Sequence, residues 1–240
     1  MKIISLVPSI TEALFDFGLD HKEVVGRTKF CIHPAEKVPN VPIVGGTKNL
    51  HPEKIFALSP DLIIANREEN EKLQIEELAK EFEVWVTEIA TLEDNRKFLQ
   101  ELGKKLNKPD KAAKFISEID NALPETELSI KAAYLIWQNP YMTVGNDTFI
   151  HDVMQKTGLI NIFGNKKRYP EITVEALEEA GIILLSSEPF PFKAQHVQEM
   201  QQIFPDKKVV IVDGEAFSWY GTHLARRKAY FEKLQKEIFG

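Results

Sequence analysis

Apolar positions along the chain fall into two kinds of block. Continuous apolar runs, such as residues 62–65 and 182–185, have the length and composition of buried strands. Between such runs, apolar residues recur at three- and four-residue spacing, as in residues 92–106 and 149–157, which predicts amphipathic helices. Strands that alternate with helices in this rhythm predict an α/β fold with mainly parallel sheets.

One predicted helix, residues 108–123, lies at the centre of the chain. Pro109 suits a first helical turn because its missing N–H would have no partner there. Phe115 and Ile119 belong to an apolar stripe at helical spacing, and Pro124 stops the helix.

The chain before this helix and the chain after it follow one plan. In each copy a short helix leads into an apolar strand, followed by a second helix and a second strand, over residues 52–89 and 174–214. Glu53 and Glu175 occupy matching points, 175 − 53 = 122 residues apart. This period is too long for a solenoid repeat. The duplication predicts two Rossmann-like lobes, each with a mainly parallel sheet, joined by a single helix.

We therefore expect three parts. They are an amino-terminal α/β lobe at residues 1–107, a connecting backbone helix at residues 108–124, and a carboxy-terminal α/β lobe at residues 125–240.

Composition narrows the possible partners. The 240 residues are 43% hydrophobic and 28% charged, which is ordinary for a globular protein. The net charge of −6 provides no basic surface for nucleic acid, and no apolar run is long enough to span a bilayer. The single Cys31 excludes an internal disulfide. We expect a monomer.

The first residues, MKIISLVPS, lead directly into a strand without a signal-peptide core. This indicates either a cytoplasmic protein or the loss of an export segment. Ser9 and Glu12 form an S-x-x-E pattern, which predicts a capping box at the start of a helix over residues 10–17, and Gly18 is its predicted stop.

Several segments together resemble one family. The order ISLVPSITEAL, VGRTKFCIHP and VGGTKNLHPEKIFALSPDLII resembles the amino-terminal lobe of class III substrate-binding proteins, and PDKAAKFISEI resembles their backbone helix. YLIWQNPYMTVGNDTFIHDVMQKTGLINIF, ITVEALEEAGIILLSS and VVIVDGEAFSW follow the carboxy-terminal lobe. These proteins serve ABC importers for cobalamin, siderophores, haem and some metals, and the cobalamin-binding branch is the most similar.

The resemblance implies a periplasmic or otherwise extracytoplasmic protein, whereas this chain shows no export signal. The backbone helix is also short for the family, at about four turns. The carboxy-terminal ligand loop does not match the cobalamin binder residue for residue.

The resemblance also implies that a ligand binds in a cleft between the lobes. A flat, largely apolar macrocycle needs aromatic faces and a few polar anchors. Phe30 matches an aromatic residue that stacks on the corrin in the cobalamin binder, and each aromatic could instead be a packed loop anchor. The candidate ligand-binding residues are Phe30, Cys31, His33, Arg67, Trp137, Tyr141, Phe217, Trp219, Tyr220 and His223.

A metal is a second possibility for this site. Cys31, His33 and His223 carry the soft sulfur and imidazole donors that transition metals, or the metal of a corrinoid or haem, prefer. A single C-x-H is a weak signal, since structural zinc sites have more ligands at regular spacing. Alternatively, His33 contributes a hydrogen bond at the cleft and Cys31 only packs.

In the family, two glutamates, one per lobe, pair with arginines of the membrane permease. Glu53 and Glu175 match them, and the resemblance therefore implies an ABC permease as partner. The local alternative is that each carboxylate only stabilises the start of a helix.

No enzyme motif supports a catalytic function. The chain lacks a G-x-G-x-x-G fingerprint, a P-loop and a G-x-S-x-G elbow. We expect a binding protein with no intrinsic cofactor, whose ligand is cobalamin or a related corrinoid. The alternatives are haem, a ferric siderophore or a transition metal, or the function of a cytoplasmic corrinoid carrier or sensor.

Overall fold

The computed structural model describes residues 1–123 and 126–240, which fall into two compact units. Unit 1 consists of Met1–Ile89, Glu93–Ser117 and Tyr220–His223, and unit 2 consists of Ala90–Leu92, Glu118–Trp219 and Leu224–Gly240. Helix α5 (Pro109–Ala122) contributes its first part to unit 1 and its last part to unit 2. The boundaries expected at residues 107 and 124 stay a prediction, and the expected stop at Pro124 lies outside the described residues.

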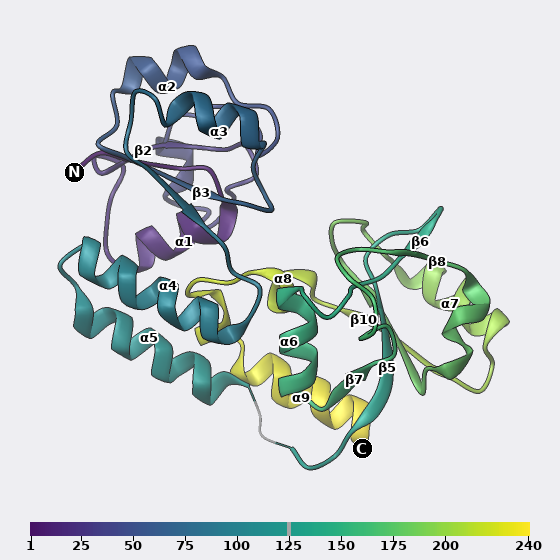
Figure 1. Cartoon of the computed structure of the whole chain (residues 1–240). Helices are drawn as coiled ribbons and strands as arrows, with labels where there is room; N and C mark the ends of the chain where they lie inside the picture. The colour runs from purple at the N-terminus through teal and green to yellow at the C-terminus, as the bar shows by residue number, and fades with distance from the viewer. Residues whose placement is uncertain (124–125) are drawn as a thin grey trace. The chain divides into compact units, whose positions relative to one another are not determined.

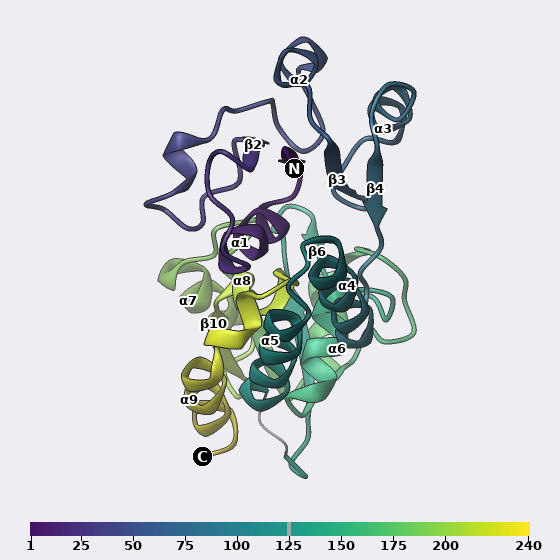
Figure 2. The same ribbon diagram turned by 90° about the vertical axis from the view of Figure 1, so that its left-hand side faces the viewer.

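Unit 1 contains a four-stranded sheet whose strands are all parallel, in the order β2-β1-β3-β4. The strands are β1 (Ile3–Ser5), β2 (Val24–Arg27), β3 (Leu62–Asn66) and β4 (Val84–Thr87). Helix α1 (Pro8–Asp16) covers one face, and α2 (Pro52–Leu58) and α3 (Lys72–Leu78) cover the other (Figures 1 and 2).

The packing of this sheet follows from the alternation of side chains along a strand. Ile4 of β1 and Ile63 of β3 pack in one cluster with Ile55 of α2 and Leu78 of α3. The intervening strand residues point to the opposite face. Both faces are therefore covered, which explains why β3 is apolar throughout.

The predicted capping box at the start of α1 is wrong. The helix begins at Pro8, Val7 is its N-cap, and no side chain caps it. Pro8 begins the helix because its fixed φ angle suits the first turn. Ser9 and Glu12 consequently lie inside the helix and are buried. The predicted stop at Gly18 is confirmed by its φ of +85°.

Unit 1 also contains most of α4 (Leu92–Lys105) and the first part of α5, which run antiparallel to each other. The first residue of α4, Leu92, belongs to unit 2. The two helices approach closely at Gly103, where an added Cβ would lie 2.7 Å from the Ala112 Cβ. Phe115 of α5 packs against Phe17 with ring centroids 5.5 Å apart. The Nζ of Lys111 donates to the Phe17 carbonyl at 3.1 Å, near the end of α1.

Unit 2 contains a second, separate four-stranded sheet, again all parallel, in the order β10-β9-β5-β7. Two separate parallel sheets confirm the predicted α/β fold class. The strands are β5 (Ile130–Leu135), β7 (Leu159–Asn161), β9 (Ile182–Ser186) and β10 (Lys208–Val212), beside a two-stranded ladder of β6 (Tyr141–Met142) and β8 (Glu171–Ile172).

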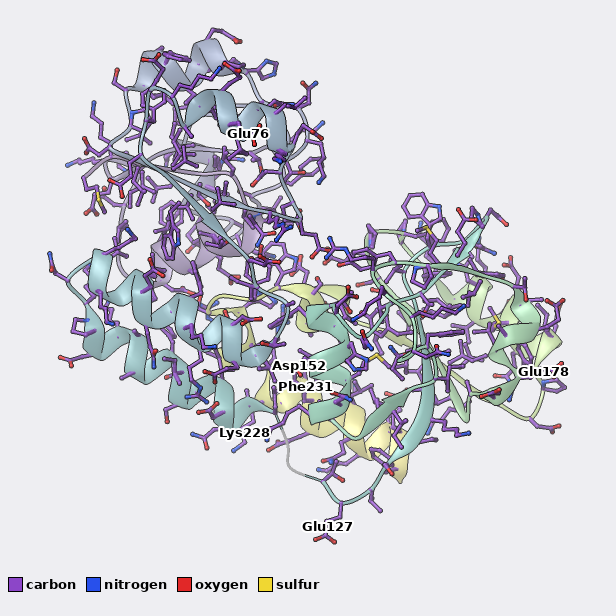
Figure 3. The ribbon with its side chains drawn as sticks, viewed as in Figure 1. Glu76, Glu127, Asp152, Glu178, Lys228 and Phe231 are labelled. Atoms are coloured by element: carbon purple, nitrogen blue, oxygen red, sulfur yellow. The ribbon has the colours of Figure 1, made fainter. Side chains whose placement is uncertain are left out.

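The α-helices that begin in unit 2 after α5 are α6 (Phe149–Lys156), α7 (Ala194–Ile203), α8 (Gly214–Ser218) and α9 (Lys228–Phe239). The 3₁₀ helices of the chain are η1 (Val38–Asn40), η2 (Val174–Glu179) and η3 (His223–Arg226). In Figure 3, the labelled Asp152 lies on α6 and Phe231 lies on α9. Asp152 accepts the Leu92 N–H at 2.7 Å, which satisfies a backbone donor at the first residue of α4.

The two copies of the predicted plan differ in detail. Glu53 and Glu175 both lie in a first helical turn, and the residue two positions later, Ile55 or Leu177, is buried in each copy. The following strands begin at Leu62 and Ile182, which are 182 − 62 = 120 residues apart rather than 122. The stretch from the glutamate to the following strand is therefore two residues shorter in the second copy, whose helix is the tighter 3₁₀ form.

In the part of the chain that the structure describes, no helix is both long and apolar enough to cross a membrane.

Candidate ligand-binding surfaces

Because every strand in each four-stranded sheet is parallel, all four strands of a sheet end at one edge. In open α/β sheets ligands bind beyond this carboxyl edge.

In unit 1, the residues that follow β2 form a loop held by Arg27. Its Nε donates to the Val38 carbonyl at 2.8 Å, and its Nη1 donates to the carbonyls of Thr28 and Cys31 at 3.2 and 3.1 Å. A single buried side chain thereby fixes both ends of a tight turn.

This turn presents Phe30 to solvent. Its side chain is 50% exposed, and the Lys29 Nζ lies 5.0 Å from its ring centroid. The neighbouring Cys31 is instead fully buried, and its Sγ contacts the hydroxyls of Thr11 and Thr28 at 3.0 and 3.2 Å. Burial raises the pKa of the Cys31 thiol. Phe30 is thus a surface on which a flat group could stack, whereas Cys31 is a packed thiol.

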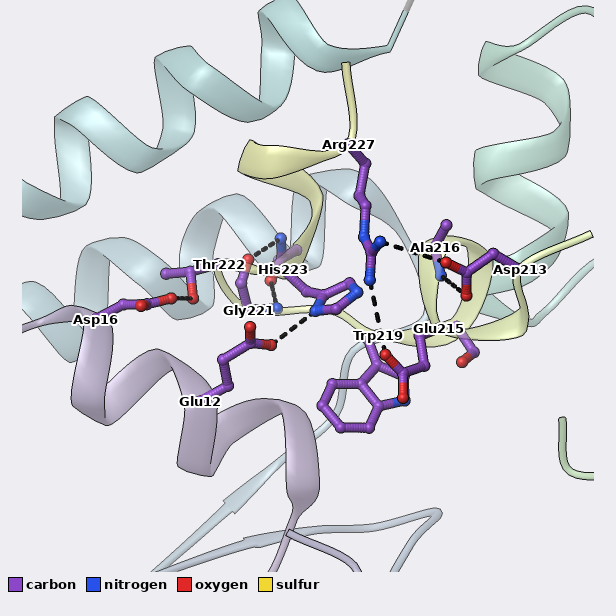
Figure 4. A network of polar contacts seen from close by, with 12 residues as sticks. Glu12, Asp16, Asp213, Glu215, Ala216, Trp219, Gly221, Thr222, His223 and Arg227 are labelled. Atoms are coloured by element: carbon purple, nitrogen blue, oxygen red, sulfur yellow. Dashed lines mark hydrogen bonds and ion pairs between the residues drawn. The ribbon is translucent and has the colours of Figure 1, made fainter. Parts of the chain in front are cut away.

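Also in unit 1, His223 forms a buried pair with Glu12. Its Nδ1 lies 2.7 Å from a Glu12 carboxylate oxygen, as Figure 4 shows. The ring of His33 lies 6.2 Å from that of His223, centroid to centroid. Among residues 1–123 and 126–240, no group of three or more His, Cys, Asp or Glu side chains is placed to hold a metal ion. The geometry brings the two predicted histidines together, beside Glu12, for which the sequence predicted only a role in a helix cap.

His223 belongs to a short segment, Tyr220–His223, which we call the strap. The strap is part of unit 1, although the residues before and after it belong to unit 2. The Thr222 hydroxyl donates to Asp16 at 2.5 Å, and the Gly221 N–H and carbonyl both bond to the Asn95 side chain, at 2.7 and 3.0 Å. Gly221 has a φ of +82°, which favours glycine.

Two buried asparagines organise the loop after β3. The Asn70 side chain accepts the Asn66 N–H at 2.8 Å and donates to the carbonyls of Leu6 and Thr47 at 3.1 and 3.0 Å. Arg67, on the same loop, is exposed and pairs with Glu88 at 3.0 Å. The position of Arg67 therefore depends on amide side chains that sequence reasoning missed.

In unit 2, the carboxyl edge is aromatic. Trp137 follows β5, is 40% exposed, and contacts Phe190 edge-on with ring centroids 5.6 Å apart. Phe190 in turn contacts Phe192 and His196, at 4.7 and 5.4 Å. Tyr141 lies near Trp137 in the chain and is partly buried. Phe190 and Phe192 of the loop after β9 and His196 of α7 thus extend the predicted aromatic set.

The same edge carries a partly buried carboxylate, Glu188. It accepts hydrogen bonds from the Ser218 hydroxyl at 2.8 Å and from the Trp219 indole N–H at 3.2 Å. Burial is the largest influence and raises the pKa of Glu188, although both hydrogen bonds oppose the shift. Glu188 was not predicted. Its one sequence signal is its place directly after an apolar strand.

Farther along unit 2, Arg227 lies between two carboxylates. Its guanidinium is 3.3 Å from Asp213 and 3.6 Å from Glu215, as drawn in Figure 4. Asp213 also accepts the Ala216 N–H and so caps α8.

Phe217, predicted to bind ligand, lies in the core of unit 2. It is fully buried, and its ring contacts Tyr134 and Phe231 at centroid distances of 5.2 and 5.5 Å. Both Phe217 and the predicted Cys31 are fully enclosed, so neither side chain has a surface to offer to a ligand. Trp219 and Tyr220 are nearly buried, at 9% and 7% exposure.

Glu53 and Glu175 are both exposed, in the first turns of α2 and η2. Glu53 lies 3.6 Å from the His51 ring. Hydrogen bonds from its own backbone N–H and from the Thr173 hydroxyl lower the pKa of Glu175. Both carboxylates are accessible, and each also has a local contact.

Comparison with known proteins relates this chain to binding proteins. The family described as periplasmic binding protein matches residues 3–202. A vitamin B12-binding protein of Vibrio parahaemolyticus is 27% identical over 183 residues, which are 72% of this chain and 66% of that protein. The match thus spans just under two thirds of that relative's length.

Two solved structures have the same fold. The periplasmic vitamin B12 binding protein BtuF of Vibrio cholerae has a TM-score of 0.77 and 18% identity, with 98% of each chain covered. The periplasmic haem binding protein HutB of Vibrio cholerae has a TM-score of 0.82 and 18% identity, with 100% of this chain and 99% of that one covered. At this level of identity, the likeness establishes the fold alone.

Proposed function

Because the chain belongs to the periplasmic binding protein family, we propose that it is the substrate-binding protein of an ABC-type importer and that its ligand is cobalamin or a related corrinoid. The family is one of binding proteins and not of enzymes. Curated relatives named as vitamin B12-binding proteins support the corrinoid.

The observation that carries the proposal is the pair of exposed aromatic residues at the carboxyl edges of the two sheets. Phe30 follows β2 in unit 1, and Trp137 follows β5 in unit 2. An aromatic side chain exposed to water costs free energy unless something covers it, and a corrin offers a large, mostly apolar area. His33 and Arg67 would add polar contacts from unit 1, and Tyr141 would add one from unit 2.

Haem is the second candidate, on a separate observation. The ring of His33 is half-buried beside His223, and an imidazole is a usual axial ligand of haem iron. Solved structures with this fold include proteins named as haem-binding.

A spectral titration separates these candidates. The purified protein is titrated with cyanocobalamin, haemin and a ferric siderophore, and the absorption of each ligand is followed. We expect saturable changes with cobalamin and no consumption of the ligand. Saturation by haem together with a Soret shift that His33→Ala removes would replace cobalamin by haem. If none of the three ligands saturates, the proposal fails.

Docking on a permease is the second part of the proposal. Glu53 and Glu175 are exposed at corresponding places in the two copies, and arginines of a permease could form bidentate pairs with them. Co-purification with a permease tests this. Without such a partner, the protein would be a carrier or sensor of its ligand and the two glutamates would be inherited helix starts.

A further inference from the structure

Arg27 is a charged side chain in an interior position. Its residue surface is only 9% exposed. Three of its N–H groups are accounted for by the carbonyls of Val38, Thr28 and Cys31, through Nε and Nη1. Within the described part of the chain, Nη2 has no hydrogen bond and no carboxylate pairs with the guanidinium.

These hydrogen bonds explain why the Arg27 side chain lies where it does, but they provide no negative charge to balance the buried guanidinium. Carbonyl dipoles offset part of the cost of burying a cation, yet buried charges in proteins are normally paired with an opposite charge. An acidic chain with a net charge of −6 has many carboxylates that could have filled this role. The missing partner therefore points to an anion from outside the chain.

A cavity of about 500 Å³ that opens widely to solvent adjoins Arg27 within unit 1. It is bordered by the 39–43 segment and by Lys54 of α2. Lys54, like Arg27, has no ion-pair partner among the described residues, and the Asn40 side chain adds a possible hydrogen-bond donor. Two cations and an amide thus border one hollow without a counter-charge.

We propose that this cavity binds a small oxyanion of the phosphate or sulfate type. The Nη2 of Arg27 would donate to it, and Lys54 would add a second, more exposed positive charge. The site lies beside the outer strand β2, and its binding does not depend on the macrocyclic ligand proposed above. Nε and Nη1 of Arg27 already donate to carbonyls, so only the N–H groups of Nη2 remain to form a charge-assisted hydrogen bond with an oxyanion.

A titration of the ¹⁵N-labelled protein with inorganic phosphate tests the proposal, with potassium chloride at matched ionic strength as reference. We expect saturable shifts of the amide signals of Asn40, Val41 and Ile43 with phosphate and none with chloride. Shifts that grow linearly without saturation, or that chloride reproduces, would overturn it.

Two lysine variants make the test specific. Lys54→Gln removes one exposed charge at the cavity and should weaken phosphate binding by up to about fivefold at low salt. Lys22→Gln changes the net charge equally but lies in the turn before β2, outside the cavity, and should leave the affinity unchanged. Equal affinities for the two variants would overturn the proposal. Arg27→Lys should abolish phosphate binding. If this variant does not fold, the comparison of Lys54→Gln with Lys22→Gln still tests the proposal.

A sedimentation assay identifies the source of the oxyanion. Vesicles of phosphatidylglycerol that bind the protein, with loss in Lys54→Gln and not in Lys22→Gln, would assign a lipid phosphate. Saturation by free phosphate without vesicle binding would assign the free ion.

Discussion

The carboxyl edges of the two sheets are built from different chemistry. In unit 1 the loop after β3 is fixed by neutral amides, chiefly Asn66 and Asn70, which bond to backbone groups. In unit 2 the corresponding edge is fixed around a carboxylate, Glu188, and an aromatic cluster. Amides do not titrate, whereas a buried carboxylate does. The two edges should therefore respond differently to mutation and to pH, although the two sheets share one topology.

The largest effect is expected from the amide framework of unit 1. Asn70→Ala removes three hydrogen bonds to buried backbone groups, and each orphaned group costs about 1–3 kcal/mol. We expect the free energy of unfolding, measured by urea denaturation, to fall by about 3 kcal/mol or more. The control Asn49→Ala changes an exposed amide and should cost less than about 0.5 kcal/mol. Similar losses in both variants would contradict the framework.

The next effect concerns the two exposed aromatic residues. Trp137→Ala and Phe30→Ala should each weaken binding of the spectrally identified ligand by about tenfold, because each removes an aromatic contact and apolar area. Phe56→Ala, on α2, removes an aromatic residue of similar exposure away from the carboxyl edge and should leave the affinity unchanged. Unchanged affinity in both edge variants would end the assignment of these two surfaces.

A smaller effect should distinguish the edges by pH. The pKa of Glu188 is raised in the folded protein, so the folded protein binds this proton more tightly than the unfolded chain. The resulting stability is full below the ordinary pKa of 4.5 and is lost as pH rises through the raised value. Glu188→Gln removes this loss and keeps an oxygen that can accept from Ser218 and Trp219.

We therefore expect Glu188→Gln to raise the melting temperature by about 2–4 °C at pH 8 and to leave it nearly unchanged at pH 4. Differential scanning calorimetry across this range measures the difference. The control Glu179→Gln changes an exposed glutamate of η2 and should leave the melting temperature nearly unchanged at both pH values. A lower melting temperature for Glu188→Gln at pH 8 would mean that the ionised carboxylate stabilises the edge.

The smallest effect is expected at the duplicated glutamates. Glu53→Lys with Glu175→Lys should leave ligand affinity unchanged and weaken association with a permease by a few-fold per site, since exposed ion pairs contribute about 0–1 kcal/mol. The loss should shrink at high salt. Pull-down from detergent extracts at two salt concentrations measures it. Full association of the double variant at low salt would exclude docking through these residues.

Much of the fold could be predicted from local pattern. Apolar runs such as β9 and glycine stops such as Gly18 depend on neighbouring residues, and both appear where the sequence placed them. The error at Ser9 and Glu12 has the opposite cause. Their spacing fits a local cap, but the Glu12 carboxylate pairs with His223, 211 positions away. Spacing alone carries no signal for a partner at that distance.

The candidate site divides in the same way. Exposed aromatic residues after strands, such as Phe30 and Trp137, can be identified from strand ends. The burial of a single side chain is harder to predict from the sequence. Phe217 was therefore predicted to bind ligand, although its ring lies in the core of unit 2. Asn70 and Glu188 were not predicted as site residues because amides and carboxylates in loops usually face water. Only the fold shows which of them are enclosed.

The strap at Tyr220–His223 bears on how this chain could be divided in the laboratory. A fragment that ends at residue 117 would contain the sheet of unit 1 and the first part of α5 but lack the strap, in which Gly221, Thr222 and His223 bond to Asn95, Asp16 and Glu12. Such a fragment would expose apolar and polar surface that the intact chain encloses near α1. A split version of unit 1 would therefore need a peptide containing the strap, added in trans or fused through a linker. A continuous amino-terminal fragment of this chain is therefore not the same as an independently folding unit 1.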